Sequence, residues 1–398
     1  MIKNVSFKNF YSFSEETNIS FNLGQKPSES YYDIKYRDER LNKVIAVIGA
    51  NGSGKTQFIR PLAFLSWFIA SSYTQLKPDD DIPYRPHILH IDKSSTVSIV
   101  FIIDDVEYKY ELELFKNEVL NESLYKKTSK YFSYLFKRER VSLEDNFTYK
   151  NKDFDFSNKL ASKIKENASI ISAAYMNDSS ESKKFIDYFA NQYSYNVNMS
   201  GRENYSETVL LESAKYFNDN SQSSDYMREL LCNMDLGLND VKIDEIEIRT
   251  EENKLEKIYM PMGVHGNRDN GKYFELPFFD ESNGTKSLFI HLRRILPILE
   301  KGGVVIIDEI DNDLHPHMLP VLIDLFKFEH SNPHNAQIIF TCHTPEILNI
   351  LNKHQVYLVE KDDYVSEAWR LDEMVGLRSD DNLYAKYYAG SLGATPDI

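Results

Sequence analysis

The clearest chemical signal in the sequence is one short stretch near the start of the chain. It matches the phosphate-loop pattern G-x-x-x-x-G-K-[ST] without a mismatch and reads Gly49-Ala50-Asn51-Gly52-Ser53-Gly54-Lys55-Thr56. In such a loop, backbone N–H groups and the positive end of the following helix bind phosphate oxygens. We expect Lys55 to reach the β- and γ-phosphates of ATP and the Thr56 hydroxyl to ligate Mg²⁺. The predicted nucleotide-binding residues of the loop are Gly49, Asn51, Gly52, Ser53, Gly54, Lys55 and Thr56.

A pair of acidic residues follows an apolar run much later in the chain. Residues 304–307 are Val-Val-Ile-Ile, which predicts a buried strand, and the strand ends in Asp308 and Glu309. We expect Asp308 to support the metal ion and Glu309 to be the base that polarises the attacking water. A carboxylate pair at a strand end is often only a turn, but a phosphate loop in the same chain favours the catalytic interpretation.

Two further motifs lie on either side of the acidic pair. Ser282 and Gly284 stand at the start of an amphipathic run, where a hydroxyl and backbone N–H groups are placed to bind a γ-phosphate. His343 ends the apolar strand predicted at 337–342 and is placed to hydrogen-bond a γ-phosphate. Asp311 is predicted to couple the γ-phosphate to a subunit interface. The predicted catalytic residues are Glu309, His343 and Lys55.

These motifs need a sheet that brings them together. Residues 44–48 predict a buried parallel strand before the phosphate loop, and residues 57–70 predict a helix after it, with a kink or an early end at Pro61. Alternating apolar residues predict an N-terminal hairpin within 1–23 and an antiparallel meander over 96–125. An N-terminal hairpin that leads into a phosphate loop favours an ABC-type head over a helicase core.

The apolar periodicity divides the chain into three parts. Residues 1–156 predict the first half of an ATPase head, residues 157–240 an inserted helical lobe, and residues 241–398 the second half of the head. The lobe shows no sustained heptad, so we expect no long coiled coil. In the third part, a strand is predicted at 241–249 and a strand pair at 257–277 around a Gly/Asn loop.

Composition limits the class of protein. The 398 residues are 42% hydrophobic and 27% charged, an ordinary globular composition. No apolar run approaches the length of a membrane span, and the N-terminus lacks the apolar core of a signal peptide, so we expect a cytoplasmic protein with no membrane partner. Cys232 and Cys342 are too few and too far apart to indicate a disulfide framework or a zinc site.

The net charge of −15 argues against a surface that binds nucleic acid as a whole. A local basic footprint remains possible at 116–165. This stretch contains 12 Lys and Arg but only 7 Asp and Glu, with aromatic residues between them. A solvated face over a half-buried aromatic element is the favoured interpretation of this region.

Taken in order, the motifs resemble those of the ABC ATPase superfamily, and specifically its RecF, SMC and OLD branch. The resemblance is closer to the coil-less ATPases of abortive-infection and phage-defence operons, namely the RloA and AbiL type and the AriA subunit of PARIS systems. The residues that carry it are 7–10 (Phe-Lys-Asn-Phe), 281–285 (Glu-Ser-Asn-Gly-Thr), 308–311 (Asp-Glu-Ile-Asp), 314–316 (Leu-His-Pro), 337–341 (Gln-Ile-Ile-Phe-Thr), His343 and 388–396. The implied fold class is α/β: an ABC-type P-loop head with a mixed sheet, flanking helices, an antiparallel β subdomain and an inserted helical lobe.

The resemblance also implies a function. ATP would be sandwiched between the phosphate loop of one head and Ser282 and Gly284 of another, so the protein would be a homo-oligomer and at least a head-to-tail dimer. Hydrolysis would then act as a switch that holds or releases a toxic effector, such as a nuclease, when a phage protein or damaged DNA is sensed. Two departures stand out: Tyr11-Ser12 replaces a usual basic residue, and Gln75 is a poor candidate for a Q-loop glutamine.

Three other functions are alternatives for this sequence. A RecF-like clamp that binds DNA in an ATP-dependent way would use Lys137, Arg138 and Arg140 as part of its footprint. A transporter head is disfavoured by the long insertion. A self-contained nuclease is disfavoured because only the acidic stretch at 360–363 follows His343, and that stretch predicts a hairpin turn.

Overall fold

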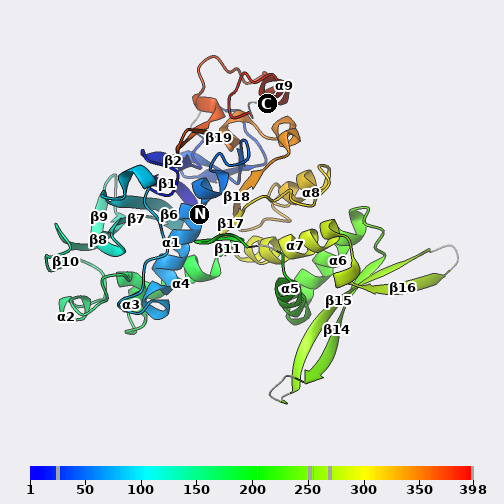
Figure 1. Cartoon of the computed structure of the whole chain (residues 1–398), viewed down its shortest axis with the longest axis horizontal. Coiled ribbons are helices and arrows are strands. Elements are labelled where there is room, and N and C mark those ends of the chain that lie inside the picture. The colour runs from blue at the N-terminus through cyan, green and yellow to red at the C-terminus, as the bar shows by residue number, and fades with distance from the viewer. Residues whose placement is uncertain (24–26, 204, 250–252, 254, 268–270, 396–398) are drawn as a thin grey trace.

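A mixed β-sheet forms the centre of the protein (Figure 1). The computed structural model describes all residues except 24–26, 204, 250–252, 254, 268–270 and 396–398. The central sheet has the strand order β11-β17-β18-β5-β19-β20. All neighbouring pairs are parallel except the last, in which β20 runs antiparallel to β19. The strands are β11 (Tyr193–Tyr195), β17 (Val304–Ile307), β18 (Gln337–Cys342), β5 (Val44–Ile48), β19 (Val356–Asp362) and β20 (Val365–Arg370).

Both faces of this sheet are buried, and the side chains of β5 alternate between two cores. Ile45 and Val47 belong to the first core, whereas Val44, Ala46 and Ile48 belong to the second. Successive side chains of a strand point to opposite faces, so a strand covered on both sides must be apolar throughout. This explains the uninterrupted apolar runs that predicted β5 and β17.

An antiparallel sheet covers the first core. Its strand order is β10-β9-β8-β7-β6-β1-β2, and it contains both the predicted N-terminal hairpin and the predicted meander. The meander turns at Asp104-Asp105 and Lys116-Asn117, where all four residues have positive φ angles as tight hairpin turns require. The strands are β1 (Ile2–Lys8), β2 (Thr17–Ser20), β6 (Ser95–Ile103), β7 (Val106–Phe115), β8 (Glu118–Lys127), β9 (Phe132–Glu139) and β10 (Thr148–Asn151).

The long helix α1 (Lys55–Gln75) begins at the phosphate loop and packs in the first core with α3 (Ile170–Tyr175) and α4 (Ser180–Asn191). Pro61 lies inside α1, and the helix continues to Gln75, so the predicted early end is wrong. The physical reason is packing, because apolar side chains on both sides of the proline, including Phe58, Leu62 and Leu65, are fully buried. A short helix, α2 (Asn158–Ala161), precedes α3.

Further helices build the second core on the opposite face of the sheet. Strands β14, β15 and β16 form an antiparallel sheet whose hairpins project away from the body of the molecule (Figure 1). The helices are α5 (Glu207–Asp219), α6 (Ser221–Asn233), α7 (Asn283–Lys301), α8 (Met318–Asp324) and α9 (Leu383–Tyr388). The strands are β14 (Asp240–Arg249), β15 (Leu255–Asn267) and β16 (Lys272–Pro277). The strands predicted at 241–249 and 257–277 are confirmed; residues 268–270 of the Gly/Asn loop lie outside the described residues.

The helices of residues 157–240 lie in two places. Helices α3 and α4 pack in the first core, α5 and α6 pack in the second, and β11 joins the central sheet between them. The division of the chain at residues 156 and 240 stays a prediction. The segment between them contributes helices to both cores and one edge strand to the central sheet.

The remaining short elements are turns and small ribbons. Short ribbons are β3 (Asp33–Tyr36) with β4 (Glu39–Asn42), and β12 (Val197–Asn198) with β13 (Gly201–Arg202). The 3-10 helices are Ile88–His90, Phe278–Asp280, Pro345–Asn349, Lys353–Gln355 and Leu371–Glu373. Of the acidic stretch predicted as a hairpin turn, residues 360–362 end strand β19 and only Asp363 lies in the turn to β20. Among the described residues, no helix combines the length and the apolar character that a bilayer crossing requires. The predicted fold class, a mixed sheet with flanking helices and an antiparallel β subdomain, is confirmed.

Candidate nucleotide site

The predicted motifs meet at one edge of the central sheet. The phosphate loop follows β5, Asp308 and Glu309 follow β17, and His343 follows β18. These three strands are parallel and adjacent in the order β17-β18-β5. Since the carboxyl ends of parallel strands lie at the same edge, motifs that are distant in sequence come together there.

Two glycines of the phosphate loop are required by close packing. A Cβ at Gly49 would overlap the carbonyl oxygen of Val359 on β19, and a Cβ at Gly54 would overlap Ser366 Oγ. Gly54 also has a φ angle of 110°, which favours glycine. Ser366 donates a hydrogen bond of 2.6 Å to the Ser53 carbonyl oxygen. The β19–β20 hairpin therefore supports the loop from behind.

The Lys55 side chain folds back over its own loop. Its Nζ donates to the carbonyl oxygens of Gly49 at 2.8 Å and Ala50 at 3.0 Å. Burial lowers the pKa of Lys55. The thiol of Cys342 and the nearby carboxylates, including Glu309 and Asp308, oppose that shift. Lys55 thus lies close enough to the acidic pair for their charges to interact.

The Asp308 side chain connects the phosphate loop to β18. Its Oδ2 accepts a 2.8 Å hydrogen bond from Thr56 Oγ1, and its Oδ1 accepts a 2.7 Å bond from Thr341 Oγ1. Burial raises the pKa of Asp308, while these hydrogen bonds oppose the rise. A hydroxyl beside a carboxylate at a phosphate loop is the donor set that suits Mg²⁺. The residues present therefore fit the predicted metal ion.

Glu309 is held from three sides. Its backbone N–H donates to Thr341 Oγ1 at 2.7 Å, and its φ angle of 50° lies in the left-handed region. Arg202 Nη1 lies 2.9 Å from Glu309 Oε2, and His343 Nε2 lies 3.7 Å from Glu309 Oε1. The predicted base is thus next to the predicted histidine and also next to a cation that the sequence did not indicate.

Sequence reasoning missed several residues of the site. Asn196 exchanges two hydrogen bonds with the backbone of Asp308, at 2.7 and 2.9 Å, and Arg202 pairs with Glu309. Thr341 and Ser366 also had no predicted role. Asn196 and Arg202 lie in the segment expected to be a helical lobe, so the apolar periodicity did not indicate a role for them. Thr341 could be suspected only from its position near the end of a strand next to β17.

Asp311 organises the turn after β18. Its Oδ2 accepts from the backbone N–H groups of His343 at 2.8 Å and Thr344 at 2.7 Å, and from Thr344 Oγ1 at 2.6 Å. Asp311 thereby holds the backbone that carries His343. Its predicted part in coupling the γ-phosphate to an interface stays a prediction.

Ser282 and Gly284 lie at the start of α7. Ser282 is the N-cap of this helix, and its Oγ accepts a 3.1 Å hydrogen bond from the Thr285 N–H. A Cβ at Gly284 would lie 2.9 Å from the Asp313 carbonyl oxygen. Among the described residues, no hydrogen bond joins either residue to the phosphate loop.

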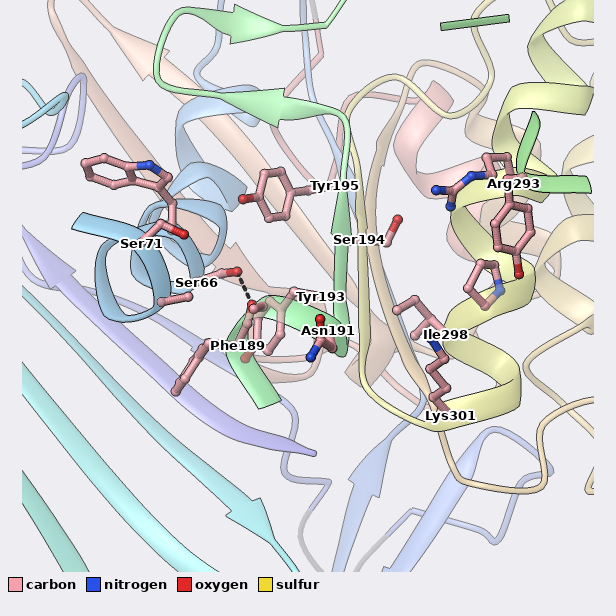
Figure 2. A pocket seen from close by; sticks show the side chains of 15 residues that line it. Ser66, Ser71, Phe189, Asn191, Tyr193, Ser194, Tyr195, Arg293, Ile298 and Lys301 are labelled. Atoms are coloured by element: carbon pink, nitrogen blue, oxygen red, sulfur yellow. Dashed lines mark hydrogen bonds between the residues drawn. The ribbon is translucent and has the colours of Figure 1, made fainter. Parts of the chain in front are cut away.

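Three cavities border these elements. One of 290 Å³ lies beside residues 50–53 and is also lined by Glu360 and Thr395. A second, of 280 Å³, is lined by Arg202, Glu309 and residues of α7. A third, of 460 Å³, lies between α1, β11 and α7, with Ser66 and Ser71 on one wall and Arg293 and Lys301 on the other (Figure 2). The first adjoins predicted nucleotide-binding residues of the phosphate loop, and the second adjoins the predicted base, Glu309, so both leave room for a ligand at the site.

The basic region at 116–165 does not present its arginines as a footprint. Arg138 is buried and donates to the carbonyl oxygens of Ala168 at 2.8 Å and Lys165 at 2.9 Å. Arg140 is buried and pairs with Glu118 and Glu166. These guanidinium groups stabilise the fold, so the interpretation of both as DNA contacts is wrong.

Residues at two other sequence departures have structural roles. Tyr11 lies under the guanidinium of Arg60, 4.3 Å from it, and its hydroxyl donates to the Met199 carbonyl oxygen at 3.1 Å. Gln75 ends α1, at the opposite end from the phosphate loop, and accepts a hydrogen bond from Trp67. Gln75 is therefore no sensor of the nucleotide.

Comparison with known proteins gives a family. Two solved structures align over most of this chain: an SMC head bound to the C-winged helix domain of ScpA (14% identity, 94% of this chain, 98% of that chain, TM-score 0.48) and the SMC head domain from Thermotoga maritima (15%, 93%, 98%, 0.43). No curated protein matches the chain. Residues 44–349, more than half of the chain, match the family described as "AAA domain, putative AbiEii toxin, Type IV TA system". The chain therefore belongs to this family of AAA-domain proteins and carries the P-loop ATPase fold on which its predicted site is built.

Proposed function

We propose that this protein is a Mg²⁺-dependent ATPase whose site is the sheet edge described above. The observation that carries the proposal is the hydrogen bond between Thr56 and Asp308, which joins the phosphate loop to a carboxylate 252 residues away in sequence. Lys55 binds the nucleotide phosphates, and Thr56 and Asp308 hold the metal ion. The bound ion supplies positive charge that neutralises phosphate oxygens. Glu309 takes a proton from the attacking water, and His343 contacts the γ-phosphate.

We further propose that two copies are needed to complete the site. Ser282 and Gly284 begin α7, where the hydroxyl and N–H groups of a helix start suit an anion. Because no hydrogen bond among the described residues joins either of them to the phosphate loop of its own chain, each would close over ATP held by a second copy. The γ-phosphate would then stabilise a head-to-tail homodimer, and hydrolysis would release it.

The proposed biological role is control of a toxic effector in a bacterial anti-phage system. Two findings support it: the family description names a putative abortive-infection toxin of a type IV toxin–antitoxin system, and the motifs resemble phage-defence ATPases. The effector would be a separate protein such as a nuclease. A phage protein or DNA would be the trigger, and the cytoplasm would be the place of action. Burial of Arg138 and Arg140 removes two basic residues from the footprint expected of the RecF-like clamp, so the structure favours the effector role over the clamp.

The proposal is tested by measuring mass and hydrolysis together. Wild type, Glu309→Gln and a matched control, Glu329→Gln at an exposed position, are analysed by light scattering with and without ATP and Mg²⁺. We expect Glu309→Gln to hydrolyse ATP at least about a hundredfold more slowly and to accumulate as an ATP-dependent dimer. The control should behave as wild type. Wild-type hydrolysis by Glu309→Gln would contradict the assignment of the base.

A second chain that co-purifies with the protein would support control of an effector. Dimerisation that requires both ATP and DNA would instead favour the clamp.

A further inference from the structure

Arg202 is the cation in direct contact with the predicted catalytic base. Its Nη1 lies 2.9 Å from Glu309 Oε2, and both side chains are about one-quarter to one-third exposed, at 26% and 32%. They line the 280 Å³ cavity next to the site. The pair is therefore accessible to small molecules, and the arginine side chain has space beside it in which to change partners.

Hydrogen bonds of the β12–β13 ribbon hold the backbone that carries Arg202. Val197 pairs with Arg202 in the β12–β13 ribbon, and the Glu203 N–H donates to the Asn196 carbonyl oxygen at 2.6 Å. Asn196 in turn holds the backbone of Asp308 through two hydrogen bonds.

Two contacts tie the ribbon to the rest of the head. Tyr11 donates to the Met199 carbonyl oxygen, and Arg294 of α7 pairs with Glu203. These contacts hold the backbone of Arg202 close to the acidic pair, so a change of partner by Arg202 needs only a movement of its side chain.

Arg202 pairs with Glu309, and the adjacent Asp308 contacts the end of the phosphate loop. Asp308 accepts a hydrogen bond from Thr56. A guanidinium is always charged and binds phosphate oxygens with fork geometry, so an incoming γ-phosphate competes with a single carboxylate for it.

We propose that Arg202 is the γ-phosphate sensor of this site: it pairs with Glu309 when the γ-phosphate is absent and transfers to the γ-phosphate of bound ATP. The exchange has two consequences. ATP gains a contact that ADP lacks, and Glu309 is released from its cation and becomes free to accept a proton from water. The inference rests on the proposed function, since it assumes that ATP binds at Lys55 and Thr56.

The test measures binding and does not depend on turnover. Affinities for Mg-ADP and for a Mg-bound ATP analogue with a non-hydrolysable β–γ bridge are measured by calorimetry for wild type, Arg202→Ala and Arg202→Lys. We expect Arg202→Ala to lower the affinity for the ATP analogue by about tenfold or more, because a hydrogen bond between charged groups is lost. The affinity for ADP should change by less than about twofold. Arg202→Lys should restore part of the preference.

The control variant is Arg228→Ala, which removes an arginine–carboxylate pair with Asp240 far from the phosphate loop and should leave both affinities unchanged. A second comparison uses Glu309→Gln. Loss of the resting ion pair should tighten binding of the analogue when Arg202 is present and have no such effect in the Arg202→Ala background. Thermal unfolding of each variant checks that the ribbon is intact.

The outcomes separate the inference from the proposed function. If Arg202→Ala lowers the affinities for ADP and for the analogue equally, or lowers neither, Arg202 is not the γ-phosphate sensor. The ATPase proposal would still stand. Absence of nucleotide binding by wild type overturns both.

Discussion

The Thr341 hydroxyl contacts both acidic residues of the site, through the side chain of Asp308 and the backbone N–H of Glu309. Its Oγ1 donates to Asp308 Oδ1 at 2.7 Å and accepts from the Glu309 N–H at 2.7 Å. Valine has nearly the same shape and neither bond. We therefore expect Thr341→Val to lower kcat by about tenfold or more, because each lost bond to a buried polar group is worth about 1–3 kcal/mol.

The measurement for Thr341→Val is steady-state ATP hydrolysis over a range of Mg²⁺ concentrations. Thr74→Val, at an exposed position near the end of α1, is the matched control and should be silent. An unchanged rate in Thr341→Val would show that the hydroxyl only fills space.

His291 on α7 makes stability depend on pH. Burial lowers the pKa of His291 to about 3, and Arg294 and Arg202 add to the effect. A histidine with a depressed folded-state pKa stays neutral in the fold but binds a proton when unfolded, so its stabilisation is present above about pH 6.5 and declines as pH falls toward 3. Between pH 7 and pH 5 the free energy of unfolding should fall by about 2 kcal/mol from this residue.

Urea unfolding at the two pH values checks this expectation. His291→Leu should show a smaller loss between pH 7 and pH 5 than wild type. His330→Leu, which changes an exposed histidine, should show the same loss as wild type. The same loss of unfolding free energy between pH 7 and pH 5 in all three proteins would contradict the assignment to His291.

At the scale of elements, a buried polar group joins the antiparallel sheet to α3. The Glu122 carboxylate on β8 accepts from the Ile170 N–H at 2.9 and 3.0 Å, from Ser169 Oγ and from the Tyr110 hydroxyl. Arg138 on β9 lies 3.8 Å from it and is almost fully buried. This cluster fixes where α3 begins against the sheet, and so it helps to place the layer of helices that supports α1.

Removal of Arg138 should destabilise the protein without touching the nucleotide site. We expect Arg138→Ala to lower the free energy of unfolding by about 3 kcal/mol, since a buried carboxylate loses its opposite charge and two carbonyl oxygens lose a donor. Nucleotide affinity below the melting temperature should be unchanged. Lys137→Ala, next in sequence but half-buried beside Tyr125, is the control. Loss of DNA binding at unchanged stability would restore the footprint interpretation.

At the scale of the whole molecule, the proposed dimer predicts complementation between two inactive variants. A Lys55→Ala subunit lacks a working phosphate loop, and a Ser282→Arg subunit blocks the helix start that closes over a partner's ATP. Each variant alone should be inactive. In a random mixture about half of the dimers are mixed, each with one intact composite site, so activity should recover to about one quarter of wild type.

Steady-state hydrolysis of the two variants, separate and mixed, measures this recovery. Mixing Lys55→Ala with Glu309→Gln is the control and should restore nothing, because both lesions lie on the same side of the composite site. Activity in Ser282→Arg alone would show that one chain is sufficient for hydrolysis.

Local sequence patterns were sufficient to predict several elements of the fold. Alternation and tight-turn residues predicted the N-terminal hairpin and the meander, and apolar runs predicted β5, β17 and β18. The order of strand, loop and helix predicted the phosphate loop. Pro61 misled the prediction of where α1 ends, because burial on both sides of a proline stabilises a helix that propensity alone would end.

Which distant residues share the site depends on tertiary contacts. Asn196 and Arg202 belong to a segment with helical periodicity on both sides, and no motif marks them. Their position follows from β11, which is three residues long and takes the free edge of the central sheet beside β17. Burial likewise decided that Arg138 and Arg140 are internal ions rather than a surface charge. Pairing across the sheet and exclusion from water depend on contacts between residues far apart in the chain, which local sequence patterns do not encode.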